Sequence, residues 1–222
     1  MRKTLLGILA VVVLLVACTH TVNVALEPDY ETNLYYDNEL SKVKPAITFF
    51  AGAYEDKRTD NTTLATFKQE IHTFNLYSDR PVDEALFDGL AVLVSKSGHE
   101  WNDSGEGQVK VNMQFLNCQA ERHAGMIKVG ASSSIQIKLD FIDAKTDDMI
   151  HTNIYNGADE RAQAMVGMMS MVEASIDASL VACVQSVGDD AGLAKALNKL
   201  NAEAEAEAEP EAEPEAEAET EN

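Results

Sequence analysis

Hydrophobic and polar residues alternate along three stretches in the second half of the chain. In the first, Val109, Val111, Met113 and Phe115 take every second position, with polar residues between them. The same two-residue period recurs over 131–142 and 149–155, on either side of a turn-like segment, 143–148. Alternation of this kind is typical of strands with one buried face. We therefore expect three strands, the last two paired as an antiparallel hairpin.

Strand-like patterns also occur in the first half of the chain. A short apolar run, 46–51, follows Pro45, and residues 70–77 alternate so that His72, Phe74 and Leu76 share one face. Residues 19–44 have few periodic apolar positions. We interpret them as a spacer, with a short strand at 21–26.

Two long segments have the period of an amphipathic helix. The first begins at Asp79-Arg80-Pro81 and ends at Gly98, which are typical start and stop signals. The second covers 162–187, with an apolar stripe formed by Met165, Met169, Val172, Ile176, Leu180, Cys183 and Val187. Met171 lies off this stripe, in a position that can be exposed. A short last helix is expected over 191–200.

The order of these elements predicts an α+β fold: a two-layer sandwich of a mainly antiparallel sheet with two main helices packed on one face. The domain would comprise residues 45–200, and 18–44 would connect it to the N-terminus. Residues 201–222 alternate Ala with Glu and contain two prolines. Repulsion between glutamates and the prolines disfavour a helix, so we expect a disordered acidic tail.

The N-terminus has the layout of a secretory signal. Arg2 and Lys3 precede an apolar run, 5–16, which is too short to span a bilayer comfortably. The segment ends in Leu15-Val16-Ala17-Cys18, which resembles the lipobox of bacterial lipoproteins. That resemblance implies removal of residues 1–17, lipidation of Cys18 and attachment to a membrane through the lipid. Thr19 after the cysteine, by resemblance to Gram-negative lipoprotein sorting, favours the outer membrane, with the domain facing the periplasm.

The charge of the chain is strongly negative, at −20. Ten glutamates lie in 201–222 and two basic residues in 1–17, so residues 18–200 keep a net charge of −12. Nucleic-acid binding requires clusters of Lys and Arg, and this balance argues against it. It also argues against a basic surface lying on anionic lipid.

Two cysteines remain after Cys18. In an oxidising compartment Cys118 and Cys183 could form a disulfide, or they could be two buried free thiols. Cys183 lies on the apolar stripe of the second helix. Cys118 lies near the expected end of a strand, out of phase with its apolar positions.

The sequence contains no P-loop, dinucleotide-binding or nucleophile-elbow motif, and we expect neither an enzyme nor a cofactor. Cys118, Glu121 and His123 are the best local group of metal-ligating residues. They lack a second group to complete a site, so no metal centre is expected. Trp101, the single tryptophan, lies between glycines in an expected loop. It could contact a partner protein or close one end of the core.

Asp56 and Arg58 follow the strand at 46–51 in an Asp-x-Arg turn, and this pattern resembles the YajG family of bacterial lipoproteins. The helix start at 79–81, the strand at 109–116 and the end of a strand at 155–157 follow in the same order. This resemblance covers residues 18–200 and implies a membrane-anchored periplasmic domain with no established enzymatic activity. On their own, Asp56 and Arg58 are expected to form a local ion pair that fixes the turn.

These features predict an envelope lipoprotein that acts as a non-enzymatic interaction or assembly module. Its sheet edge or the Trp101 loop would contact another envelope protein, for instance by strand addition. The alternative is a carrier of a small apolar ligand or lipid, held between helix and sheet near the methionines of 165–171. Neither the partner nor the oligomeric state follows from the sequence.

Overall fold

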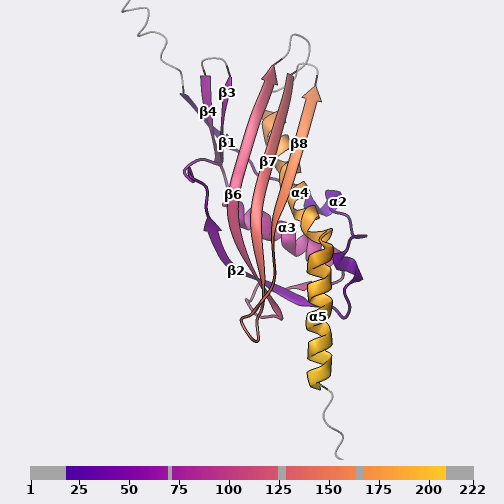
Figure 1. The fold of residues 1–222 in the computed structure, drawn as a ribbon. Coiled ribbons are helices and arrows are strands. Elements are labelled where there is room, and N and C mark those ends of the chain that lie inside the picture. Colours follow the sequence, from indigo (N-terminus) through magenta and orange to yellow (C-terminus); the bar gives the residue numbers. More distant parts are fainter. Residues whose placement is uncertain (1–18, 70–71, 125–128, 164–167, 209–222) are drawn as a thin grey trace, which may run out of the picture.

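The computed structural model describes residues 19–69, 72–124, 129–163 and 168–208 (Figure 1). Its strands are β1 (Thr19–Val24), β2 (Thr48–Asp56), β3 (Ala65–Gln69), β4 (His72–Ser78), β5 (Glu100–Trp101), β6 (Val109–Ala124), β7 (Val129–Asp143) and β8 (Met149–Gln163). Its helices are α2 (Tyr30–Asn33), the 3-10 turn η1 (Leu40–Lys42), α3 (Val82–Lys96), α4 (Met168–Gly188) and α5 (Ala191–Ala208).

The larger sheet has five strands in the order β5-β2-β6-β7-β8. The three strands expected from their alternation are β6, β7 and β8. They form an antiparallel meander, and the predicted hairpin is its β7–β8 pair. Strand β2 pairs parallel with both β5 and β6, which the sequence did not indicate. A smaller sheet has the order β1-β4-β3, with β1 parallel and β3 antiparallel to β4.

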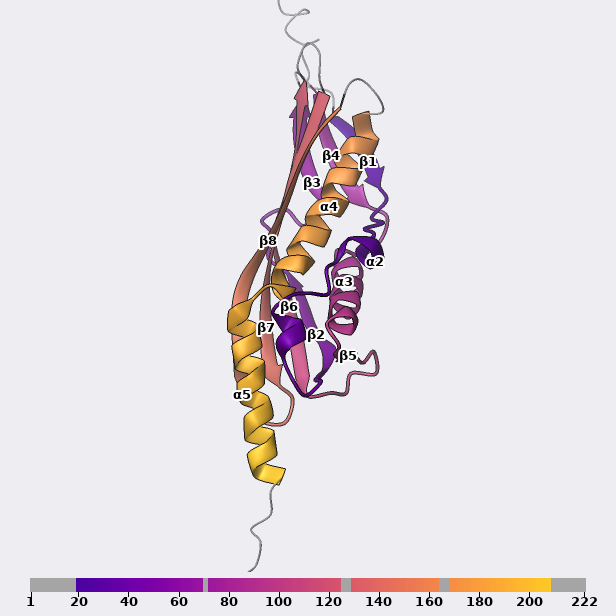
Figure 2. The same ribbon diagram turned by 90° about the vertical axis from the view of Figure 1, so that its right-hand side faces the viewer.

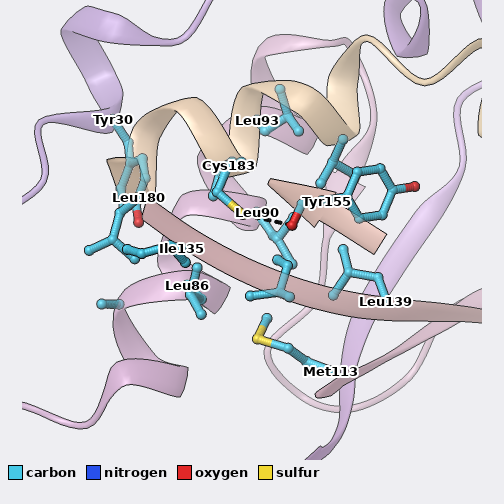
Figure 3. Packing of buried hydrophobic residues seen from close by; sticks show 14 of the residues in the cluster. Tyr30, Leu86, Leu90, Leu93, Met113, Ile135, Leu139, Tyr155, Leu180 and Cys183 are labelled. Carbon is cyan, nitrogen blue, oxygen red and sulfur yellow. Dashed lines mark hydrogen bonds between the residues drawn. The ribbon is translucent and has the colours of Figure 1, made fainter. Parts of the chain in front are cut away.

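Helix α4 packs along β7 and β8, with α3 beside it, and α5 continues past the lower end of the sheet (Figure 2). The predicted α+β class, a sheet layer and a helix layer, is confirmed, with three main helices instead of two. One core joins the layers (Figure 3), and its largest fully buried side chains include Phe49, Phe115, Leu86, Met113 and Leu139.

Helix α4 is the central helix of this core. Its segment Ser170–Gly188 is long and apolar enough to cross a membrane, but 56% of that window is buried inside the protein. The predicted stripe is confirmed for Val172, Ile176 and Leu180, among others. Met171 is also buried, so its expected exposure was wrong. The helix begins later than predicted because β8 continues through Gln163, whereas Met165 lies outside the described residues.

The interpretation of 19–44 as a spacer was wrong. This segment belongs to the folded domain: β1 joins the smaller sheet, and several apolar side chains from the end of β1 onward are buried in the core, namely Val24, Leu26, Tyr30, Leu34, Leu40 and Val43. The disordered tail was also placed too early, since α5 runs to Ala208. There the Asn201 amide donates a hydrogen bond to the Pro45 carbonyl at 3.0 Å. Residues 209–222 lie outside the described residues.

A β-bulge in β6 explains the phase of Cys118. The register to β7 shifts between Phe115 and Asn117, so the buried face moves from odd to even positions. Cys118 therefore points into the core, with only 8% of its surface exposed. The strand also continues to Ala124, so the expected strand end near Cys118 was wrong.

Candidate functional site

Asp56 and Arg58 form the local ion pair expected from the sequence, and it is largely buried. Arg58 Nη2 lies 2.6 Å from Asp56 Oδ2, and Nη1 of the same guanidinium donates to the carbonyls of Thr63 and Leu64. The guanidinium carbon is 4.6 Å from the Phe115 ring centroid, a cation–π distance. Burial raises the pKa of Asp56, but the hydrogen bonds from Arg58 outweigh it and hold that pKa below its usual value. The pair therefore joins β2, the turn before β3 and β6.

Trp101 lies in the short strand β5 and not in a loop. Its ring is partly buried against the core and lies 6.1 Å from the Phe87 ring of α3, measured between centroids. The following residue, Asn102, donates its amide to the Phe49 carbonyl at 2.8 Å. Trp101 therefore packs against α3 and the core, as expected for a side chain that closes one end of the core, and its contact with a partner protein stays a prediction.

Both described cysteines are free thiols in the structure. Cys183 lies over β8, where its thiol is 3.6 Å from the Tyr155 carbonyl (Figure 3), whereas Cys118 lies two strands away on β6. Neighbouring strands are separated by about 4.8 Å, so this placement exceeds the reach of a disulfide. Burial raises the pKa of each thiol to about 12. Cys18, the predicted lipidation site, lies outside the described residues.

The metal-ligand group suggested by spacing is not assembled. Cys118 is buried while Glu121 and His123 are exposed on β6, and the turn that would bring them together is absent because the segment is extended. Within the described ranges, no three His, Cys, Asp or Glu side chains are placed to hold a metal ion.

Asp190 forms a polar cluster that sequence reasoning missed. Its Oδ2 accepts hydrogen bonds from Tyr155 Oη and Asn153 Nδ2, both at 2.8 Å, and lies 2.9 Å from His151 Nε2. Its Oδ1 accepts from the first amides of α5, including that of Gly192 at 2.7 Å. Burial opposes ionisation of this carboxyl, but these hydrogen bonds outweigh it and hold the pKa of Asp190 well below its usual range. An Asp directly before a helical segment is a capping signal, and here it ties α5 to β8.

An open groove of about 570 Å³ runs along the side of α4 that faces away from the sheet. Four small apolar side chains of α4 form its floor: Ala174, Ala178, Val181 and Ala182. Its second wall is the segment after β1, which includes α2 and lies beside α4 in Figure 2. Arg161, near the end of β8, also lines it.

A hydrogen bond ties the second wall of the groove to α4: the amide of Tyr35 donates to Gln185 Oε1 at 2.8 Å. Asp29 caps α2 by accepting a hydrogen bond from the Thr32 amide at 3.0 Å. The groove is thus a fixed feature of the fold.

The groove is acidic. Glu27, Asp29, Asp177 and Asp189 line it, and the charge of Arg161 is paired with Asp159, at 2.7 Å from Nε to Oδ2. Within the described residues, Asp177 Oδ1 is buried without a hydrogen-bond partner. Burial, and then the nearby carboxylates, raise the pKa of Asp177 to about 6. The groove can therefore offer carboxylate acceptors beside a small apolar floor.

The sequence contained a signal for this groove. Ala174, Ala178 and Ala182 recur every four residues on α4, opposite the core stripe. The second wall could not be predicted, because residues 27–35 have no helical or strand period of their own.

No protein-family model matches this sequence, and no curated protein sequence matches it. Among solved structures, the fold is similar to that of XCC0632 from Xanthomonas campestris, a DUF330 protein, with a TM-score of 0.56 at 8% identity, covering 82% of this chain and 99% of that one. A protein assigned as a neuraminyllactose-binding hemagglutinin homolog from Helicobacter pylori aligns with a TM-score of 0.47 at 11% identity, covering 81% and 100% of the two chains. A minor lipoprotein from Acinetobacter baumannii aligns at 0.33 and 10% identity, covering 66% and 92%. The latter two similarities are too distant to support an argument. At this level of identity, the likeness to XCC0632 shows a shared fold.

Proposed function

We propose that this protein is a YajG-like lipoprotein of the Gram-negative envelope that acts by contacting another protein and not by catalysis. The signal-like residues 1–17 and the lipobox-like Cys18 support the anchor. Thr19, the residue after Cys18, already begins β1, so the lipid would be attached next to the folded domain. Thr19 also favours the outer membrane, with the domain in the periplasm.

The groove along α4 is the observation that supports a contact function most directly. It is open and acidic, and the hydrogen bond from Tyr35 to Gln185 ties its second wall to α4. The main polar clusters elsewhere have evident structural tasks. Asp56 and Arg58 join strands, and Asp190 caps α5. The groove residues Ala178 and Ala182 have no comparable task in the core.

Among the described residues, no observation favours the apolar-ligand carrier. The space between helices and sheet is filled by the core cluster, and a cavity found there, lined by Phe49 and Trp101 among others, holds about 10 Å³. That volume is about the space for one water molecule. Of the methionines in 165–171, Met171 is packed in the core.

Cross-linking in intact cells tests the proposed function. The full-length tagged protein, its Ala178→Arg variant and its Ala158→Arg variant are cross-linked, purified and compared by mass spectrometry. Ala178 lies on the groove floor, whereas Ala158 is exposed on β8 outside the groove, so the two variants add the same charge and volume at different surfaces. We expect a reproducible partner with the wild type and with Ala158→Arg, and its loss with Ala178→Arg. Equal recovery from all three, or no reproducible partner, would contradict the proposal.

A further inference from the structure

We propose that the groove along α4 binds a cationic amphipathic helix of the partner protein. This inference rests on the contact function proposed above and specifies the chemistry of the segment that is recognised.

The dimensions of the groove match a helix. Its lining on α4 extends from Ala174 to Ser186, which corresponds to about 18 Å of helix, or roughly three turns. The floor residues have short side chains, and small residues let two helices pack closely. A helix with small or apolar residues on one side could lie against Ala178 and Ala182.

The charges of the groove specify a basic occupant. Glu27 and Asp29 line one wall, and Asp177 and Asp189 line the other. Arg161, the cationic residue of the lining, is already paired with Asp159. Lysine or arginine side chains flanking the apolar side of a bound helix would therefore meet carboxylates on both walls.

Asp177 adds a second, independent argument. Its Oδ1 is buried without a partner among the described residues, and its pKa is raised to about 6. Both features disfavour the charged carboxylate in the free protein. A lysine or arginine from the occupant would supply the missing hydrogen bond and the compensating charge.

One exposed tyrosine lies at the rim: Tyr35 lines the groove with 70% of its surface exposed. Aromatic rings at the edge of an acidic groove can pack on the alkyl stem or the charged head of a basic side chain. Tyrosine is also frequent among residues that dominate binding energy.

The acidic C-terminal segment of this chain does not suit the groove. Residues 201–222 contain ten glutamates and no basic residue, so they would be repelled by its carboxylates. A second copy of the chain is the remaining competitor, and the experiment includes it as an outcome.

Peptide binding to the full-length protein in nonionic detergent tests the inference. The probe is a labelled helical peptide of Ala, Leu and Lys, about eighteen residues long, with its lysines flanking one apolar side. The same peptide with Glu in place of Lys is the control. Fluorescence anisotropy at physiological ionic strength gives Kd. One variant carries Glu27→Gln and Asp189→Asn in the groove, and the matched variant carries Glu203→Gln and Glu205→Gln on α5. Each pair removes two exposed negative charges from a chain of net charge −20.

We expect the lysine peptide to bind the wild type and the glutamate peptide not to bind. The double variant in the groove, Glu27→Gln with Asp189→Asn, should raise the Kd of the lysine peptide about tenfold. The double variant on α5 should raise it by less than about twofold. Equal weakening by both pairs would show attraction to net charge alone and would overturn the inference, as would the absence of binding at about millimolar peptide. A dimer in sedimentation equilibrium that the Ala178→Arg variant no longer forms would assign the groove to a second copy. In each of these cases, the proposed contact function is still supported if cross-linking in cells recovers a partner with the wild type and loses it with Ala178→Arg.

Discussion

Gly157 of β8 lies directly against the backbone of α4 at Cys183. A Cβ atom added at Gly157 would be 2.4 Å from the Cys183 amide nitrogen and 1.9 Å from the Ser179 carbonyl oxygen. Beside this contact, Ser133 Oγ of β7 lies 2.6 Å from Ser179 Oγ. The sheet therefore sets the position of α4 on one side, and the groove lies along the other side of the same helix.

The close approach at Gly157 predicts a large effect of substitution. Gly157→Val should lower the free energy of unfolding by about 3 kcal/mol, because the side chain would have to displace helix backbone and not a flexible side chain. Ala158→Val, at an exposed position of the same strand, should change it by less than about 0.5 kcal/mol. Urea denaturation measures both, and similar values for the two variants would contradict the packing described.

The ion pair between Asp56 and Arg58 should stabilise the fold more than a surface pair does. Asp56→Asn leaves the largely buried Arg58 without its counter-charge, so we expect a loss of about 2–3 kcal/mol. Glu55→Gln removes a carboxylate from the neighbouring exposed pair with Lys57 and should cost less than about 0.5 kcal/mol. Chemical denaturation measures the free energy of unfolding of both variants. If Asp56→Asn lowers it no more than Glu55→Gln does, the ion pair between Asp56 and Arg58 adds no more stability than a surface pair.

Asp190 predicts a dependence of stability on pH. Its pKa is lowered in the folded protein, so the unfolded chain binds a proton first, near its ordinary value of about 3.9. The stabilisation is therefore fully present above about pH 5 and is lost as the pH falls below about 4. In Asp190→Asn, the slope of unfolding free energy against pH in this acid range should be shallower than in the wild type.

Tyr155→Phe separates the hydrogen bonds of this cluster from the charge. It removes one hydrogen-bond donor to Asp190 and keeps the carboxylate. The slope of unfolding free energy against pH in the acid range should therefore be reduced by less than in Asp190→Asn. Thermal unfolding at a series of pH values gives both slopes. Identical slopes in the wild type and Asp190→Asn would refute the role assigned to Asp190.

The proposed anchor makes Cys18 the residue that holds the protein at the membrane. Cys18→Ser should move the protein from the membrane fraction to the soluble fraction, or leave it unprocessed, because a serine cannot receive the thioether-linked lipid. Cys118→Ala and Cys183→Ala replace buried free thiols and should leave fractionation unchanged. Membrane recovery of Cys18→Ser equal to that of these controls would disprove the anchor.

Local periodicity predicted the elements that pack one face on the core. Strands β6, β7 and β8, helix α3 and the apolar stripe of α4 follow from alternation or helical spacing, because burial of one face selects those periods. The two-layer α+β class follows from their order. The alternation failed to predict burial where a β-bulge shifts it: the bulge after Phe115 moves Cys118 to the buried face of β6.

Long-range pairing could not be predicted. Nothing local indicates that β2 pairs parallel with β6, or that β1 joins β4 across about fifty residues of sequence. For the same reason, the sequence pattern predicted a spacer over residues 19–44: the apolar residues of 24–43 follow no regular period, yet they fill the space beside α3 and α4. Tyr30, for example, packs against Gly89 of α3.

The candidate site was the least predictable part. Trp101 and the ion pair at Asp56 were candidate sites because of their residue types. In the structure, Trp101 packs against the core and the ion pair joins neighbouring strands. The groove combines one face of α4 with a wall distant in sequence, so it exists only in the folded chain. Only the repeated alanines of α4 indicated part of it.

Site-specific photo-cross-linking in intact cells tests the central claim most directly. A photoreactive amino acid is placed in turn at Ala178, Ala182 and Gln185 along the groove, and at the exposed Lys195 and Lys199 of α5 as controls. The contact function predicts one discrete cross-linked product from the groove positions, absent from the α5 positions and dependent on irradiation. The same product from both helices, or none from the groove, would contradict it.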